Sequence, residues 1–274
     1  NGEIYNYRAL RQRLNAKGYQ FRSESDTEVL LHLYQEYDSD MVEHLRGMYA
    51  FAIWDERKHG LFLSRDPFGI KPLYYADNGT TIRVASQVKA LLKSHEIDTS
   101  PEPAGHVGFY LWGHVPDPYT LYRGIRALPA GATLWVDTTG HEETRQGFNR
   151  TTEVAKPSEA PLIISQEDLR QGLRAALLDT VRSHLVADVP VGVFLSAGLD
   201  STTLAALAKE VGATELRTIT LGFKEFQGTP GDEVPLAELV AKQYGTCHQT
   251  RWVTKEDFQK ERDGILDAMD QPST

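Results

Sequence analysis

The chain has 274 residues, and 38 acidic against 29 basic side chains give it a net charge of −9. Such a length is typical of about two domains of ~150 residues each, which can bury cores without disulfide or metal staples. The acidic balance excludes a general binder of nucleic acid or of acidic membranes, because no basic excess neutralises phosphates. Its one cysteine, Cys247, cannot form an internal disulfide, which favours a reducing, cytoplasmic compartment. No apolar run approaches the ~20 residues that cross a bilayer.

The first half alternates short helices with β-hairpins. The S-D-T-E pattern of residues 25–28 is a capping box, and the apolar positions that follow predict a helix through Tyr37. A second short helix, residues 40–46, is expected to end at Gly47. The predicted strands are residues 49–54, 61–64, 73–76, 81–86 and 133–137, and a short helix is predicted at 86–93.

A polar, aperiodic stretch at residues 148–164 is interpreted as a linker between domains 1–147 and 165–274. Beyond it, the expected helices are 166–185, 202–211, 236–244 and 256–269, and the expected strands are 191–195, 217–223 and 248–253. This alternation favours a doubly wound parallel sheet. The continuous apolar run 191–195 predicts a strand buried on both faces.

The loop Ser196–Ser201 carries the strongest chemical signal. A strand that runs through a small-residue loop into a helix directs backbone N–H groups at one point, which suits phosphate. Asp200 would repel phosphate without an intervening cation, so it implies Mg²⁺. Neither the Walker pattern nor the G-x-S-x-G elbow fits these residues. The alternative is a tight strand–helix turn with a capping serine.

Three further motifs occur in a fixed order with this loop: N-G-E-I-Y-N at residues 1–6, S-D-T-E at 25–28 and S-R-D-P-F-G-I-K-P-L-Y-Y at 64–75. Together they closely resemble the glutamine-hydrolysing asparagine synthetases, over nearly the whole chain. The resemblance implies an incomplete α+β sandwich of the N-terminal-nucleophile-hydrolase type, which is a class II glutaminase. An incomplete α/β parallel-sheet domain of the ATP pyrophosphatase type is implied after it.

In the glutaminase domain, the resemblance implies that Asn1 and the Gly2 backbone form an oxyanion hole, since preorganised donors stabilise a developing negative charge. Both are also implied to contact glutamine, with Glu3 and Asp26 holding its α-ammonium group. Because Asp26 follows Ser25, helix capping is its alternative role. The family's nucleophilic N-terminal cysteine and its arginine for the glutamine carboxylate have no counterpart in these residues. We therefore expect a fragment without glutaminase activity.

In the synthetase domain, the resemblance implies ATP and Mg²⁺ as cofactors. The implied ATP-binding residues are Leu195, Ser196, Gly198, Asp200, Ser201 and Leu221. Asp200 is the implied Mg²⁺ ligand. Ala197 replaces the first glycine of the family's S-G-G-x-D-S loop, and strains it only if that position needs a positive φ. The family's second phosphate loop lies beyond these residues, so synthetase activity of the chain alone is not expected.

The resemblance implies a ligase that transfers glutamine-derived ammonia to β-aspartyl-AMP. Its partners would be glutamine, ATP and aspartate or another carboxylate; a homodimer is compatible with it, and nucleic acid and membranes are not expected. Two alternatives stay open. One is an amidotransferase or β-lactam-synthetase-like enzyme that adenylates a different carboxylate, and the other is a non-catalytic scaffold. Retention of Asn1, Gly2, Glu3 and Asp26 favours the use of glutamine.

Four further residues are expected to have structural rather than catalytic roles. Arg65 and Asp66 are expected to form an ion pair that shapes their loop. Lys71, before Pro72, is expected to shape the fold as well. Cys247, between a helix and a strand, is interpreted as a buried, inert thiol.

Overall fold

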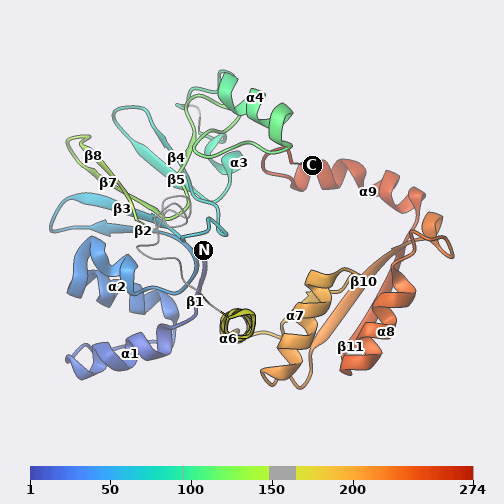
Figure 1. Cartoon of the computed structure of the whole chain (residues 1–274). Coiled ribbons are helices and arrows are strands. Elements are labelled where there is room, and N and C mark those ends of the chain that lie inside the picture. Colours follow the sequence, from blue (N-terminus) through green and yellow to red (C-terminus); the bar gives the residue numbers. More distant parts are fainter. Residues whose placement is uncertain (95, 148–164, 274) are drawn as a thin grey trace. The chain divides into compact units, whose positions relative to one another are not determined.

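The computed structural model describes residues 1–94, 96–147 and 165–273 of the chain. It divides into two compact units (Figure 1): the first contains Asn1–Pro157 together with Met269–Thr274, and the second contains Ser158–Ala268. The expected linker, residues 148–164, lies outside the described residues. Within the described chain, no helix combines the length and hydropathy that a membrane crossing requires.

The first unit contains two antiparallel sheets. Its elements are β1 (Gly2–Ile4), α1 (Tyr7–Ala16), α2 (Asp26–Tyr37), η1 (Asp38–His44), β2 (Gly47–Asp55), β3 (Gly60–Arg65), β4 (Tyr74–Asp77), β5 (Ile82–Ala85), α3 (Val88–Leu91), α4 (Pro103–Trp112), β6 (Arg126–Ala127), β7 (Ala132–Asp137) and β8 (Glu142–Gln146). One sheet has the order β1-β2-β3-β7-β8 and the other has the order β5-β4-β6.

Apolar side chains join these layers. Leu14, Leu33 and Phe62 belong to one buried cluster, which packs α1 and α2 against the five-stranded sheet. A second cluster, with Leu63 and Leu134, includes the partly buried Tyr75 of the three-stranded sheet and so joins the two sheets. The predicted α+β sandwich is therefore confirmed.

The start of α2 follows the sequence expectation only in part. Ser25 is its N-cap, and its hydroxyl accepts a hydrogen bond from the Thr27 amide. The contact that a capping box predicts for Glu28 is wrong. Glu28 accepts hydrogen bonds from the amides of Arg22 and Ser23 and not from that of Ser25. The short helix expected at 40–46 is a 3-10 helix, η1, that begins directly after α2 at Asp38.

The second unit is an α/β arrangement around a parallel sheet. Its elements are α6 (Gln166–His184), β9 (Gly192–Phe194), α7 (Leu199–Glu210), β10 (Arg217–Phe223), η2 (Lys224–Phe226), α8 (Val234–Tyr244), β11 (Cys247–Val253) and α9 (Lys255–Ala268). Both strand pairings are parallel, in the order β11-β10-β9, which confirms the predicted parallel sheet. Val181, Ala205 and Ala237 pack α6, α7 and α8 into one core.

Two expectations around β9 are wrong. The strand is not buried on both faces, because Phe194 is 74% exposed, and it lies at an edge of the described sheet. Helix α7 begins at Leu199 rather than Thr202, because Gly198 is its extended N-cap residue. Asp200 and Ser201 therefore lie in the first turn of a helix, not in the loop.

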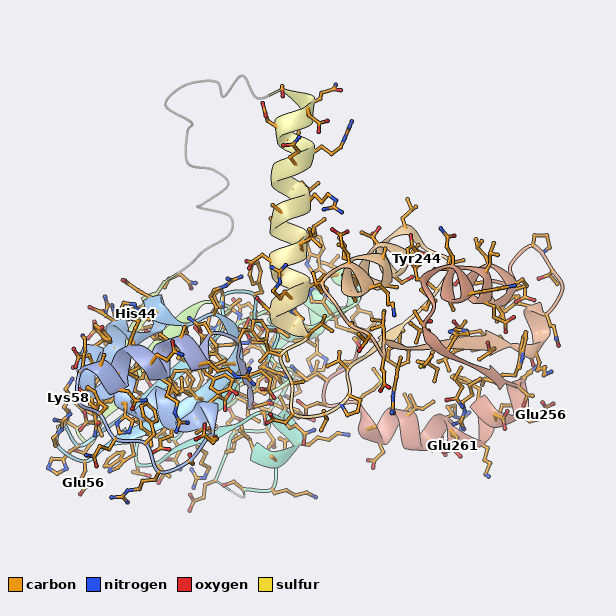
Figure 2. The ribbon with its side chains drawn as sticks, turned by 90° about the horizontal axis from the view of Figure 1, so that it is seen from below. His44, Glu56, Lys58, Tyr244, Glu256 and Glu261 are labelled. Atoms are coloured by element: carbon orange, nitrogen blue, oxygen red, sulfur yellow. The ribbon has the colours of Figure 1, made fainter. Side chains whose placement is uncertain are left out.

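The helix expected to reach Met269 ends at Ala268, and its residues are exposed, as Figure 2 shows for Glu256 and Glu261. The segment after it belongs to the first unit. Asp270 accepts hydrogen bonds from the amides of Val88 (2.8 Å) and Lys89 (3.0 Å), at the start of α3. The residue before α3, Gln87, makes no side-chain capping bond, so Asp270 supplies the cap from a distant part of the chain.

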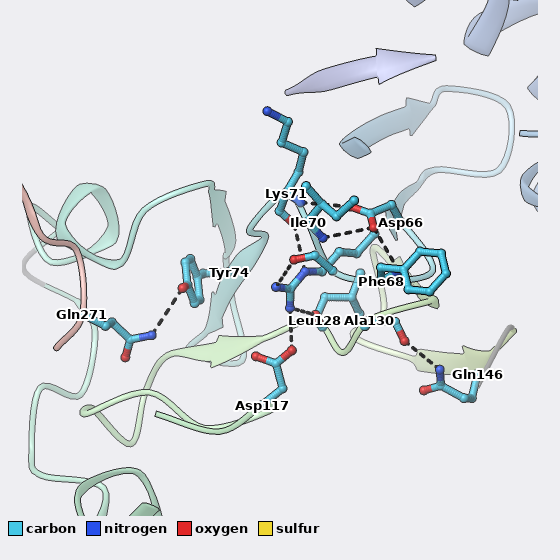
Figure 3. A network of polar contacts seen from close by, with 12 residues as sticks. Asp66, Phe68, Ile70, Lys71, Tyr74, Asp117, Leu128, Ala130, Gln146 and Gln271 are labelled. Carbon is cyan, nitrogen blue, oxygen red and sulfur yellow. Dashed lines mark hydrogen bonds and ion pairs between the residues drawn. The ribbon is translucent and has the colours of Figure 1, made fainter. Parts of the chain in front are cut away.

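Gln271 continues this docking on the first unit. Its side-chain oxygen accepts a hydrogen bond from the Leu121 amide (3.3 Å), and its nitrogen donates one to the Tyr74 hydroxyl (3.3 Å; Figure 3). Ser273 forms an isolated antiparallel bridge with His114. Residues 269–273 thus complete the first unit.

Candidate functional sites

Strand β1 carries two of the predicted glutaminase residues, Gly2 and Glu3, and Asn1 directly precedes it. It pairs with β2, with Gly2 opposite Tyr49 and Glu3 opposite Met48. Asn1 extends this pairing, since its carbonyl accepts a hydrogen bond from the Ala50 amide (2.8 Å). Gly2 has φ +123°, and an added Cβ would lie 1.9 Å from the Met48 carbonyl oxygen. Only glycine fits this point of the strand.

The start of α2 brings Asp26 to the same strand. The Asp26 Oδ2 atom accepts a hydrogen bond from the Ile4 amide at 3.0 Å. Ser25 provides the helix cap, so the Asp26 carboxylate is used to join α2 to β1. Glu3, one residue before Ile4, is exposed. The fold thus gathers Asn1, Gly2, Glu3 and Asp26 around one short strand.

Asp66 supports this region from the loop after β3. Its carboxylate accepts hydrogen bonds from the amides of Phe68, Ile70 and Lys71 (Figure 3). It also accepts one from the amide of Tyr49, the β2 residue opposite Gly2. The loop that follows β3 is therefore fastened to the strand beside β1.

The expected ion pair between Arg65 and Asp66 is wrong. Arg65 forms its ion pair with Asp117 at 2.7 Å and donates to the carbonyls of Gly69, Lys71 and Leu128. Both side chains still shape the loop, as expected, and Lys71 takes part through its backbone. A guanidinium has five N–H donors in a planar fork, which suits this set of carbonyl acceptors.

Negative charge collects around β1. Burial, followed by the charges of Asp66 and Glu3, raises the pKa of Tyr5. Burial and the charge of Asp66 raise the pKa of Tyr49 to about 12. An acidic neighbourhood of this kind is suited to a substrate ammonium group.

The first unit also contains a cavity of about 540 Å³. Its lining comes from η1, β2, β3, β7 and β8 and contains Glu43, Phe68 and Arg145. None of the four predicted glutaminase residues lines it. The local geometry of β1 and α2, rather than this cavity, defines the candidate site.

The predicted phosphate loop lies at the carboxyl end of β9. Ser196 and Ser201 have their hydroxyl oxygens 2.9 Å apart, and the Ser201 oxygen also accepts a hydrogen bond from the Ser196 amide. The Ser196 hydroxyl oxygen accepts one from the Gly198 amide at 3.2 Å. The two serines therefore close the loop on itself.

The other predicted ATP residues lie at the same edge of the sheet. Asp200 is exposed in the first turn of α7, where backbone N–H groups lack intrahelical acceptors. Leu195 is 2% exposed and follows β9, whereas Leu221 is 46% exposed near the end of the neighbouring β10. Ala197 does not have a positive φ, because in the described chain only Asp38 and His59 do so among non-glycine residues. The alanine substitution does not strain the loop in this way.

The donor set at this edge is compatible with Mg²⁺. Among the residues that the structure describes, no group of three or more His, Cys, Asp or Glu side chains could enclose a metal. Mg²⁺ commonly uses one or two carboxylates and completes its shell with water and substrate phosphates. Asp200, exposed beside the loop, fits that kind of site.

Cys247 is exposed, so the expectation of a buried thiol is wrong. It begins β11, an outer strand of the described sheet.

A contact that the sequence analysis missed involves Thr220 of β10. Its hydroxyl donates to the Leu195 carbonyl at 2.6 Å. The sequence signal for this contact is the pair of threonines at alternate positions of β10, Thr218 and Thr220, which places two hydroxyl groups on one face of the strand.

Comparisons with known proteins divide the chain in a similar way. A family model described as a glutamine amidotransferase domain matches residues 1–147. A second model, described as asparagine synthase, matches residues 172–274. The two matches follow each other in the order of the two structural units.

Several curated relatives match nearly the whole chain. Asparagine synthetase [glutamine-hydrolyzing] 1 of Bacillus subtilis is 36% identical over 273 residues, which cover 99% of this chain and 41% of the relative. Asparagine synthetase B of Escherichia coli is 34% identical, over 97% of this chain and 43% of the relative. A putative asparagine synthetase of Methanocaldococcus jannaschii is 32% identical, over 99% of this chain and 51% of the relative. The chain thus spans about half, or less, of each relative's length.

A solved structure of glutamine phosphoribosylpyrophosphate amidotransferase from B. subtilis also matches, with 17% identity and a TM-score of 0.40. The match covers 99% of this chain and 72% of that one. Similarity at this level supports no functional conclusion.

Proposed function

The chain belongs to the glutamine amidotransferase family, and on that premise we propose that it contains parts of both catalytic domains of a glutamine-hydrolysing asparagine synthetase. The observation that carries the proposal is the gathering of Asn1, Gly2, Glu3 and Asp26 around β1. We place the glutaminase domain at residues 1–147, the linker at 148–164 and the synthetase domain at 165–274.

In the glutaminase reaction, the proposed role of Asn1 and Gly2 is to stabilise the oxyanion of the tetrahedral intermediate. Gly2 lets the backbone come close at this point because no side chain intervenes. Glu3 and Asp26 would bind the α-ammonium group of glutamine. Asp26 is oriented for this by its hydrogen bond with the Ile4 amide, and the acidic surroundings favour a cation.

In the synthetase reaction, the proposed role of Ser196–Ser201, which form the loop after β9 and the first turn of α7, is to bind the phosphates of ATP. The first turn of α7 presents backbone N–H groups and a positive dipole end to an anion. Leu195 and Leu221 would contact the nucleotide, and Asp200 would hold Mg²⁺. Mg²⁺ held by Asp200 would supply charge neutralisation at the phosphates. The acceptor carboxylate, aspartate or another acid, would attack the α-phosphorus of ATP and release pyrophosphate, and ammonia would then attack the acyl carbon and release AMP.

The role of Asp26 can be tested in the intact enzyme that contains this chain. Asp26→Ala should raise the KM for glutamine by about tenfold or more, because a charge-assisted hydrogen bond of about 1.5–3 kcal/mol is lost. Synthesis from added ammonium salt should stay unchanged, since it bypasses glutamine. Glu24→Ala is the control, as the Glu24 side chain is 93% exposed. Unchanged glutamine kinetics would remove Asp26 from the site.

The role of Asp200 can be tested by titrating Mg-ATP into the intact enzyme at several Mg²⁺ concentrations. Asp200→Asn should weaken binding most at low Mg²⁺, because the carboxylate is the proposed ligand. Asp263→Asn, on exposed α9, is the control. Equal affinities at every Mg²⁺ concentration would exclude the proposed role.

The 274-residue chain alone should release no ammonia from glutamine. Its one cysteine, Cys247, lies in the second unit, so the first unit holds no thiol nucleophile. A coupled ammonia assay checks this directly. Ammonia release that Asn1→Ala abolishes would contradict the expectation.

A further inference from the structure

Thr220 is buried, at 4% exposure, at the centre of β10. Its hydroxyl donates a hydrogen bond to the carbonyl of Leu195 at 2.6 Å. Leu195 is the first residue after β9, where the strand pairing ends with Phe194 opposite Ile219. The Leu195 amide donates in turn to the Ile219 carbonyl at 2.8 Å. Both polar backbone groups of Leu195 are thus held by β10.

This attachment fixes the point from which the phosphate loop departs. Ser196 follows immediately, and its amide donates to the Ser201 hydroxyl oxygen in the first turn of α7. Two hydrogen bonds and the intervening Leu195–Ser196 peptide bond therefore link Thr220 of β10 to Ser201 of α7. A loop that binds an anion through its backbone works best when its N–H groups are positioned before binding.

We propose that Thr220 is a positioning residue for the phosphate loop, holding the Leu195 carbonyl so that Ser196–Ser201 leave the sheet in the direction that ATP requires. The inference rests on the proposed function of that loop. Thr220 itself does not contact the nucleotide in this assignment. It acts through Leu195, because a buried hydroxyl and a buried carbonyl that satisfy each other resist displacement.

Thr218 provides a matched control on the same strand and the same buried face. It is 3% exposed, and its hydroxyl contacts the Thr246 hydroxyl (2.7 Å) and His248 Nδ1 (2.9 Å) instead of the loop. Thr218→Val and Thr220→Val each replace one buried hydroxyl by a methyl group of similar size. Thr220→Ser keeps the hydroxyl and serves as the rescue variant.

The first measurement is hydrogen exchange of the loop amides in the 274-residue chain without nucleotide. Thr220→Val should speed exchange at residues 196–201, whereas Thr218→Val and Thr220→Ser should leave these amides near wild type. If Thr220→Val loses its fold, as seen by circular dichroism, Thr220→Ala takes its place because it removes the hydroxyl without adding bulk. Equal exchange in the Thr218 and Thr220 valine variants would overturn the proposal.

The second measurement is Mg-ATP affinity of the intact enzyme. Thr220→Val should weaken it about tenfold, equivalent to about 1.4 kcal/mol, and Thr220→Ser should restore it. Loss in the serine variant equal to that in the valine variant would overturn the proposal. If the wild-type enzyme binds no Mg-ATP, the proposed function of the loop fails, and the exchange measurement alone still decides whether Thr220 positions it.

Discussion

Gly2 occupies a position where a side chain would meet the neighbouring strand. Gly2→Ala should lower the unfolding free energy of the first unit by more than about 2 kcal/mol, because positive-φ strain of about 1–3 kcal/mol adds to a clash. The clash is with the Met48 carbonyl, 1.9 Å from the added Cβ. Gly18→Ala is the control, since Gly18 has φ +95° but no atom within 4 Å of an added Cβ. Equal costs in denaturant titrations would show that the clash is relieved.

Single side chains were predicted best where their partners are close in sequence. The S-D-T-E pattern of residues 25–28 predicts Ser25 as a cap, and the amide that it caps, that of Thr27, is only two residues away. The partners of Arg65 could not be predicted, since Asp117 and Leu128 lie 52 and 63 residues further along the chain. The roles assigned to the site residues remain predictions, because only their positions are visible in the fold.

Helix α2 is held at its start by Glu28, which also orders the residues before Asp26. Hydrogen bonds, first from the Ser23 hydroxyl and then from the Arg22 amide, lower the pKa of Glu28 to about 2 from 4.5. The folded chain thus binds this proton less tightly than the unfolded chain. The stabilising contribution of Glu28 is complete above about pH 4.5 and is lost as the pH falls towards about 2.

Glu28→Gln should therefore make the stability of the first unit less dependent on pH between about 2 and 4.5. Urea midpoints measured across this interval for wild type and variant would show the difference. Glu24→Gln is the control, because its side chain is 93% exposed. Parallel wild-type and Glu28→Gln curves would contradict the assignment.

Secondary structure was predictable wherever the periodicity and the boundary residues agree. The alternating strands β2 and β3 and the helices of the second unit follow such patterns. Strand β8 was missed because Glu142–Gln146 is polar and exposed throughout, so its pairing with β7 leaves no alternation in the sequence. Helix α4 was missed although Pro103 and Gly113 mark its two ends.

The first unit is discontinuous in sequence, and Asp270 is the residue that shows this most directly. Asp270→Ala should lower the unfolding free energy of this unit by about 1 kcal/mol, the usual cost of losing a helix cap. Asp270→Asn keeps one acceptor oxygen and should cost less. Asp263→Ala, on exposed α9, should cost nothing measurable. An unchanged first-unit transition in Asp270→Ala would show that the cap at α3 is dispensable.

The sequence pattern could not predict that the chain returns to the first unit after α9. Residues 256–269 have an apolar helical pattern, which predicted a continuous helix but contained no sign that Asp270 bonds to Val88, 182 residues away. The family model for asparagine synthase likewise extends over these residues. Contacts in three dimensions, rather than sequence order, assign only Met269–Thr274 to the first unit.

The exposed Cys247 makes the second unit directly accessible to spectroscopy. It is the one cysteine of the chain, so a thiol-reactive fluorophore would label a single site without any engineered substitution. The label would lie on the first residue of β11. The Cys247 amide donates a hydrogen bond to the carbonyl of Leu216, the residue directly before β10. Emission from the label should report unfolding of the parallel sheet separately from that of the first unit, which has no thiol to label.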